Sequence, residues 1–236
     1  MQGKHKTAID EGLNWVNNTF EPVAVIVSGS IIRGNPNENS DLDIFVIHEK
    51  EFRQRVQKFF NNIPCEILVN NYSHVYGYFE KELKSNRPVT AHLISTGKIY
   101  FGEETDELKN LVSTAKEYLT KTPEFNEKVN IKYTYLISGL FEDATDTMNA
   151  DRQTSLFFLN KMIGEIIEFV FLKNNVPLPR SKERIKYMVE NFPELGKLTV
   201  EFYVTEPFNK KYEIARQIVL MTIGETGFFE WDSGPE

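Results

Sequence analysis

The chain has 236 residues, and 27 lysines and arginines against 34 aspartates and glutamates give it a formal net charge of −7. A hydrophobic content of 41% is enough for a packed core, so the composition excludes an intrinsically disordered chain. Both halves are mildly acidic, which disfavours duplex DNA as a partner because phosphate binding usually requires a basic face.

Cysteine content and the distribution of apolar residues predict the compartment. The single cysteine, Cys65, cannot form an internal disulfide, as is usual in a reducing cytoplasm. The N-terminus is polar and lacks the apolar segment of a signal peptide. The most apolar stretch, residues 156–172, is interrupted by lysine and glutamate and is not expected to span a membrane. We therefore expect a soluble cytoplasmic protein.

The first hundred residues alternate between strand-like and helix-like patterns. An apolar run at 23–27 ends at Ser28-Gly29-Ser30 and predicts a buried strand, and the polar segment 33–40 predicts a loop. The other elements predicted here, in chain order, are a helix at 7–18, a strand at 41–47, an amphipathic helix at 49–60, a strand at 66–69, helices at 73–84 and 89–96, and an edge strand at 98–101.

From about residue 105 the pattern is helical only. The segment 152–174 is apolar on most sides, as expected for the central helix of a bundle. We therefore predict an α+β fold with a small mixed-sheet domain at residues 1–104 and an all-helical bundle domain at residues 105–236. The predicted helices of the bundle are 105–119, 126–148, 152–174, 181–191 and 207–223.

Two aspartates in the predicted strand 41–47 are the strongest chemical signal. Asp41 and Asp43 point to the same face, because side chains alternate along a strand, and their Cα atoms are roughly 7 Å apart. Their carboxylates can converge on a pair of divalent ions. Magnesium prefers such oxygen ligands and accepts others from substrate phosphates. The pair therefore predicts a site for two Mg²⁺ ions and a phosphorylated substrate.

Residues in the neighbouring elements extend this site. Glu66 supplies a third acid if its strand lies beside the aspartate strand, and metal ions would relieve the repulsion among the three. Gly29 lets backbone N–H groups approach an anion, and the Ser30 hydroxyl can donate to a phosphate oxygen. Arg33 follows and could hold a terminal phosphate, although a solvated arginine is equally compatible with this loop.

The combination resembles the nucleotidyltransferase superfamily related to DNA polymerase beta. The matching residues are Gly29-Ser30 after the first strand, Asp41-Leu42-Asp43 about ten residues later, and an acid on a later strand, here Glu66 where the family often has Asp. The resemblance covers roughly residues 20–70. It implies that Asp41 and Asp43 bind magnesium, that Glu66 binds a metal or activates the acceptor hydroxyl, and that Ser30 contacts a nucleoside triphosphate.

The second half is similar to the helical domain of bacterial nucleotidyltransferases, some of which modify aminoglycosides or lincosamides. This weaker resemblance implies that Asp143 or Asp146, one turn apart on a helix, orients an acceptor, and that Lys182 contacts the nucleotide phosphates. A solvated helix face is the alternative for the two aspartates. The chain lacks the arginine–histidine motif of the toxins that accompany short nucleotidyltransferases.

The expected activity is Mg²⁺-dependent transfer of a nucleoside monophosphate, with AMP from ATP as the expected case, to a hydroxyl or amine of a small molecule, with release of pyrophosphate. Two alternatives stay open: adenylylation of a protein or RNA, and a non-catalytic regulator that binds nucleotide. Homodimer formation is also left open. The feature that would support a macromolecular acceptor is a basic strip formed by Arg180, Lys182, Arg184 and Lys186, although such a strip more often coats a helix surface.

Overall fold

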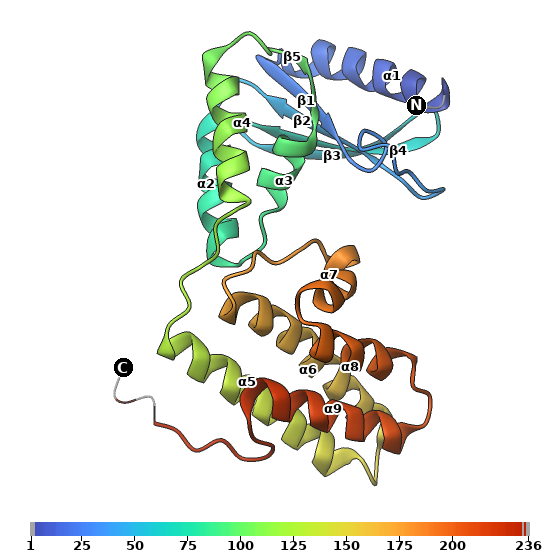
Figure 1. Cartoon of the computed structure of the whole chain (residues 1–236). Helices are drawn as coiled ribbons and strands as arrows, with labels where there is room; N and C mark the ends of the chain where they lie inside the picture. The colour runs from blue at the N-terminus through green and yellow to red at the C-terminus, as the bar shows by residue number, and fades with distance from the viewer. Residues whose placement is uncertain (1–2, 233, 235–236) are drawn as a thin grey trace. The chain divides into compact units, whose positions relative to one another are not determined.

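The structure, a computed structural model, describes residues 3–232 and 234. The chain forms two compact units, Met1–Lys121 and Thr122–Glu236 (Figure 1). The division therefore lies after Lys121 and not at the expected position 104/105. The reason is helix α4 (Asp106–Tyr118), whose buried residues Leu108 and Leu111 pack into the core of the first unit.

A five-stranded mixed sheet forms the centre of the first unit, with strand order β3-β4-β2-β1-β5 (Figure 1). Strands β2 and β4 are parallel, whereas β1 is antiparallel to both β2 and β5, and β3 is antiparallel to β4. This order places the predicted aspartate strand between the other two strands that carry site residues. The strands are β1 (Ala24–Ser28), β2 (Leu42–Ile47), β3 (Gln54–Phe60), β4 (Ile63–Asn70) and β5 (Lys98–Phe101).

Helices cover both faces of this sheet (Figure 1). The long helix α1 (Gly3–Phe20) packs on one face, where Leu42, Ile44 and Val46 of β2 join its buried residues in one core cluster. The opposite face carries Phe45 and Ile47 and is covered by α4 together with two further helices. Side chains alternate along β2, so its two sets of apolar residues enter the two core clusters, and helices bury both faces of this central strand. These two further helices are α2 (Tyr72–Lys84) and α3 (Val89–Thr96).

The segment 49–60, expected to be an amphipathic helix, forms an irregular loop and strand β3 instead. The prediction was wrong because Val56 and Phe60, four residues apart, imitate a helical spacing, while an exposed edge strand lacks the alternation of a half-buried one. Asn61 and Asn62 both have positive φ, 43° and 59°, which is the geometry of a two-residue hairpin turn between β3 and β4.

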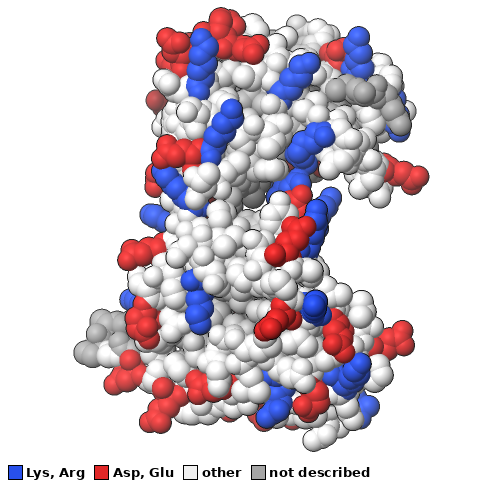
Figure 2. All heavy atoms as spheres, viewed as in Figure 1, with Lys and Arg blue, Asp and Glu red and all other residues white. Residues whose placement is uncertain are grey.

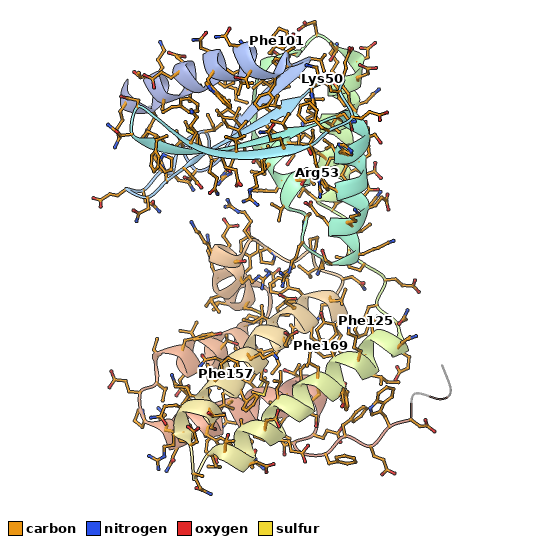
Figure 3. The ribbon with its side chains drawn as sticks, turned by 180° about the vertical axis from the view of Figure 1, so that it is seen from behind. Lys50, Arg53, Phe101, Phe125, Phe157 and Phe169 are labelled. Atoms are coloured by element: carbon orange, nitrogen blue, oxygen red, sulfur yellow. The ribbon has the colours of Figure 1, made fainter. Side chains whose placement is uncertain are left out.

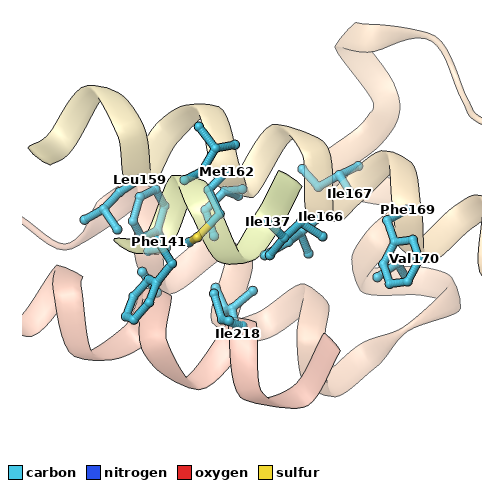
Figure 4. Packing of buried hydrophobic residues seen from close by; sticks show 14 of the residues in the cluster. Ile137, Phe141, Leu159, Met162, Ile166, Ile167, Phe169, Val170 and Ile218 are labelled. Atoms are coloured by element: carbon cyan, nitrogen blue, oxygen red, sulfur yellow. The ribbon is translucent and has the colours of Figure 1, made fainter. Parts of the chain in front are cut away.

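The second unit is helical and is built around one apolar core (Figure 4). Side chains of Asn126 and Asp151 cap two of its helices by accepting the N–H groups of Val129 and Thr154. The aromatic rings of Phe125 and Phe169, both marked in Figure 3, lie 5.9 Å apart. The elements are α5 (Glu127–Thr147), α6 (Arg152–Lys173), the 3₁₀ helix η1 (Ser181–Glu183), α7 (Arg184–Asn191), α8 (Pro193–Val204) and α9 (Phe208–Ile223).

The expected fold class, a mixed sheet with helices followed by a helical unit, is confirmed. Helix α8 is not among the predicted helices; it begins with Pro193 in its first turn, a position that proline favours. Within the part of the chain that the structure describes, every helix is too short or too polar to cross a membrane.

Candidate active site

Three polar side chains lie across neighbouring strands at one end of the sheet. Asp43 of β2 is the register partner of Ser28 on antiparallel β1 and of Glu66 on parallel β4. Residues paired directly in this way present their side chains on the same face of the sheet. The strand order therefore brings the serine hydroxyl and the two predicted acids together, although Glu66 lies far along the chain from Asp43.

The electrostatics of this group are those of crowded acids. Asp41 is exposed just before β2, and Asp43 is half-buried. The pKa of Asp43 is raised to about 6, first by burial and then by the negative charges of Asp41 and Glu66, whereas the guanidinium groups of Arg33 and Arg55 act in the opposite direction. The neighbouring carboxylates thus disfavour ionisation of Asp43. A bound cation would relieve this repulsion.

A tight turn places backbone directly against the two aspartates. Gly29 has φ +98°, and a Cβ atom there would lie 3.0 Å from the carbonyl oxygen of Asp41 and 3.3 Å from Oδ2 of Asp43. Glycine is required here for both its left-handed conformation and its lack of a side chain. The following residues form a turn, in which the Arg33 N–H donates to the Gly29 carbonyl at 3.2 Å.

The loop from this turn to β2 is held by a buried serine. Ser40 is 8% exposed. Its hydroxyl oxygen accepts the Ser30 hydroxyl at 2.7 Å and the Asn37 N–H at 2.8 Å. These bonds fix the loop that carries Ser30 against the residue immediately before Asp41. Ser40 therefore positions both the predicted phosphate-binding serine and the first aspartate.

The donor set suits magnesium, because carboxylate and hydroxyl oxygens are the ligands that this ion prefers. In residues 3–232 and 234, no three His, Cys, Asp or Glu side chains are close enough to hold a metal ion by themselves. Asp41 and Asp43 would therefore share their ions with oxygen atoms of substrate phosphates and water. The Ser28 hydroxyl is fully buried beside Asp43 and lacks a hydrogen-bond partner among the described residues.

Glu66 does not join the two aspartates as a third member of a compact acidic group. Its carboxylate instead forms an ion pair with the Arg55 guanidinium of β3. Arg55 is not among the predicted site residues, because its segment was expected to be a helix. The signal that could have identified it is Asn61-Asn62, which marks a hairpin and hence two paired strands.

The predicted residues of the second unit are all exposed. Asp143 and Asp146 lie on the solvent side of α5, and Lys182 lies in η1. Nothing in their described surroundings distinguishes the two aspartates from a solvated helix face. Their expected roles toward an acceptor, and that of Lys182 toward phosphates, stay predictions.

The basic strip of the second unit is largely neutralised by neighbouring acids. Arg180 pairs with Glu183, and Arg184 pairs with Glu168 at 2.9 Å. Lys186 lies 3.7 Å from Glu190 in the next turn of α7. On the face of the molecule shown in Figure 2, basic and acidic side chains are interspersed. The strip is therefore a set of ion pairs and not a continuous basic surface.

Comparisons with known proteins agree with this geometry. Residues 10–121 match the nucleotidyltransferase domain family. A comparison with curated proteins gives no significant match. The solved structures that match include a nucleotidyltransferase-like protein from Exiguobacterium sibiricum 255-15, with a TM-score of 0.53 and 11% identity, over 94% of this chain and 75% of that chain.

The sheet, the turn before the acids and the matched family together define a nucleotide-transferring class of enzyme. Over the matched residues 10–121, the first unit is a nucleotidyltransferase domain. The likeness to the Exiguobacterium protein extends over most of the chain and shows that the overall fold is shared.

Proposed function

We propose that this enzyme transfers a nucleoside monophosphate, AMP from ATP, to a hydroxyl or amine of a small molecule in a Mg²⁺-dependent reaction. The observation that carries the proposal is the close approach of the Gly29 turn to the aspartates. A Cβ atom at Gly29 would lie only 3.0 Å from the carbonyl oxygen of Asp41. A phosphate group lying on this turn would be adjacent to both carboxylates. The turn that would bind phosphate and the carboxylates that would bind magnesium are therefore neighbours.

The chain's own residues position the triphosphate. The backbone N–H groups of the turn bind its oxygen atoms, and Arg33 supplies a positive charge beside them. The Ser30 hydroxyl joins them by turning its hydrogen from the Ser40 oxygen to a phosphate oxygen. Asp41 and Asp43 hold magnesium, which when bound would neutralise charge on the phosphates. The site contributes mainly by positioning and charge neutralisation, as in other phosphoryl transfers.

The bond changes balance without a further reactant. The acceptor oxygen or nitrogen forms a bond to the α-phosphorus, and the bond from that phosphorus to the bridging oxygen breaks. Pyrophosphate leaves with the electron pair of that bond. Glu66 takes on its Oε2 the proton that the acceptor loses, because Oε1 is the oxygen that pairs with Arg55. Among the three acids, Glu66 is the one furthest from the Gly29 turn in the order of the strands.

Transfer to a protein or RNA loses its main support. The basic strip was the only feature of the sequence that favoured such an acceptor, and three of its four cations are engaged with acids. Recognition of nucleic acid would require cations that are available for phosphates. We therefore favour a small acceptor, and no observation in the structure favours a non-catalytic regulator.

The test is transfer of label from ATP radiolabelled in its α-phosphate to compounds in a low-molecular-mass cell extract, with magnesium present. We expect new labelled products and an equal amount of pyrophosphate. Asp43→Asn should reduce both by about 100-fold or more, because it removes a carboxylate that would hold magnesium against the reacting phosphate. Glu51→Gln, which removes an exposed acid beyond the other end of β2, should leave them unchanged. Equal transfer by the Asp43→Asn variant would refute the proposal.

A further inference from the structure

A pocket adjoins the acids on the side of the sheet away from the Gly29 turn. It has a volume of about 230 Å³ and includes Asp41 and Glu66 in its lining. The other residues that line it come from the β3–β4 hairpin: Gln57, Lys58, Phe59, Pro64 and Cys65. The proposed function uses only the two acids of this pocket, so the role of the hairpin residues is open.

The register of the sheet explains why the pocket exists. β2 begins at Leu42, which is paired with Cys65 of β4. The first two residues of β4, Ile63 and Pro64, therefore precede the part of β4 that β2 covers, but they remain paired with β3. The hairpin extends past the start of β2 and leaves a recess beside Asp41.

The order of the strands determines on which side of the aspartates the pocket lies. The sheet runs β3-β4-β2-β1, so the Gly29 turn after β1 and the pocket on β3 and β4 lie on opposite sides of the β2 aspartates. In an in-line displacement, the attacking group approaches the α-phosphorus opposite the leaving pyrophosphate. If the turn holds the phosphates that leave, the acceptor must arrive from the β4–β3 side.

The residues of β3 supply both polar and apolar contacts. Gln57 is the register partner of Glu66, so its amide lies on the same face as that carboxylate. The Phe59 side chain is 72% exposed, although it is large and apolar. Lys58 lies on the other face, with its ammonium 5.3 Å from the centre of the Trp15 ring. Burial raises the pKa of the Cys65 thiol to about 11, so this side chain stays neutral.

We infer that this pocket binds the acceptor and that Gln57 and Phe59 determine which acceptor is used. The inference rests on the proposed function and adds a binding site within the first unit. The acceptor is a small molecule with an apolar face that packs on the Phe59 ring and a polar group that hydrogen-bonds to the Gln57 amide. Its hydroxyl or amine then lies beside Glu66.

The test compares two pocket variants with two matched controls. Phe59→Ala and Gln57→Ala alter the pocket, whereas Phe101→Ala removes an exposed aromatic ring from the other edge strand (Figure 3) and Gln54→Ala removes an exposed glutamine from the start of β3. All four positions are exposed, Phe101 to 50%, so all four variants should fold.

The measurement is transfer of label from α-phosphate-labelled ATP to acceptors of the same cell extract, at two extract concentrations. We expect the pocket variants to lose about tenfold in rate at the lower concentration and to recover partly at the higher one, as for a change in KM. Binding of MgATP should be unchanged in all four variants, and the controls should transfer as the wild type does.

Two results separate failure of this inference from failure of the proposed function. If the wild type forms labelled products and the pocket variants form the same products at the same rates, the acceptor binds elsewhere and the inference is refuted. If the wild type binds MgATP but forms no labelled product from the extract, the proposed transfer itself is refuted.

Discussion

Gly29 holds a backbone conformation that other residues adopt only at a cost in free energy, and Asp43 buries a charge at such a cost. Gly29 has a left-handed φ of +98°, and Asp43 is a half-buried acid whose pKa is raised to about 6. Such features concentrate at functional sites, where binding of a ligand offsets their cost. At the scale of single residues, the site is therefore arranged for a phosphate and a cation.

Replacing Gly29 with alanine tests this arrangement. The strained φ and the Cβ contacts with Asp41 and Asp43 should lower the free energy of unfolding by about 1–2 kcal/mol or more. The added methyl group should also displace the aspartates and weaken MgATP binding by about tenfold. Chemical denaturation and calorimetry measure the two effects.

Gly224→Ala is the matched control for this substitution. Gly224 has φ +84°, but a Cβ there would have no neighbour within 4 Å. The control should lose a comparable amount of stability from backbone strain and bind MgATP as the wild type does. If both alanine variants bind MgATP normally, the close approach at Gly29 has no part in nucleotide binding.

At the scale of elements, residues with a strong local pattern were predictable and β3 was not. Ser28-Gly29-Ser30 and Asp41-Leu42-Asp43 follow or begin strands with buried, apolar patterns, so the sequence alone located them. β3 is exposed at most positions, and its only large apolar spacing imitates a helix. The Arg55–Glu66 ion pair depends on the pairing of β3 with β4. The periodicity of a sequence does not show which strands pair.

Helices α2 and α3 are joined by an acid whose energetics depend on pH. Glu82 of α2 accepts the backbone N–H of Thr90 at 2.8 Å and the Thr90 hydroxyl at 2.6 Å. Burial raises the pKa of Glu82, and the two hydrogen bonds from Thr90 partly counter this rise. Because the folded-state pKa is above the ordinary value, the free energy of unfolding falls as pH rises through this range.

Thr90→Val should make the free energy of unfolding fall more steeply as pH rises. Loss of the hydroxyl donor raises the pKa of Glu82 further, so the variant should lose about 1–3 kcal/mol at about pH 8 and less at about pH 4, where the acid is protonated. Urea denaturation at both pH values measures the difference. Thr96→Val is the control, because the Thr96 hydroxyl donates to the neutral carbonyl of His92 at 2.7 Å. An equal loss at both pH values for Thr90→Val would contradict this account.

Arg184 and Lys182 are close in sequence but differ in structural role. The side chains of Arg184 and Glu168 are each only 18% exposed and join α7 to α6, whereas Lys182 is exposed in η1. Arg184→Gln should therefore lower the free energy of unfolding by about 2 kcal/mol, because it leaves a largely buried carboxylate without this partner. Lys182→Gln should change it by less than about 0.5 kcal/mol.

Denaturation of both variants checks this difference, and equal stability would show that the ion pair contributes nothing. The result also decides how a macromolecular acceptor should be tested. Charge reversal at Arg184 would damage the helical unit, so loss of transfer in that variant would not identify a binding surface. Lys182→Glu alone removes an exposed cation without that complication.

At the scale of the whole molecule, each unit has an apolar core of its own. Two clusters bury the faces of the sheet in the first unit, and one cluster joins the helices of the second (Figure 4). The sequence predicted this change from a mixed sheet to helices but placed it too early, because α4 has the same helical pattern as the bundle. Only its packing on the sheet assigns α4 to the first unit. The candidate nucleotide site lies wholly within that unit.

The central claim is that Asp41 and Asp43 bind nucleotide through magnesium, and calorimetry of MgATP binding tests it most directly. The comparison is between the wild type, the Asp41→Asn/Asp43→Asn variant and a Glu49→Gln/Glu51→Gln control. The control removes two exposed acids with the same spacing from the loop after the other end of β2. All three proteins should be compared with and without magnesium.

We predict magnesium-dependent binding of ATP by the wild type and by the control, and its loss in the Asp41→Asn/Asp43→Asn variant. That result would establish the acid pair as the nucleotide site and justify a search for the acceptor. Magnesium-dependent binding that survives in the Asp41→Asn/Asp43→Asn variant would contradict the account, as would a wild type that binds neither ATP nor another nucleoside triphosphate.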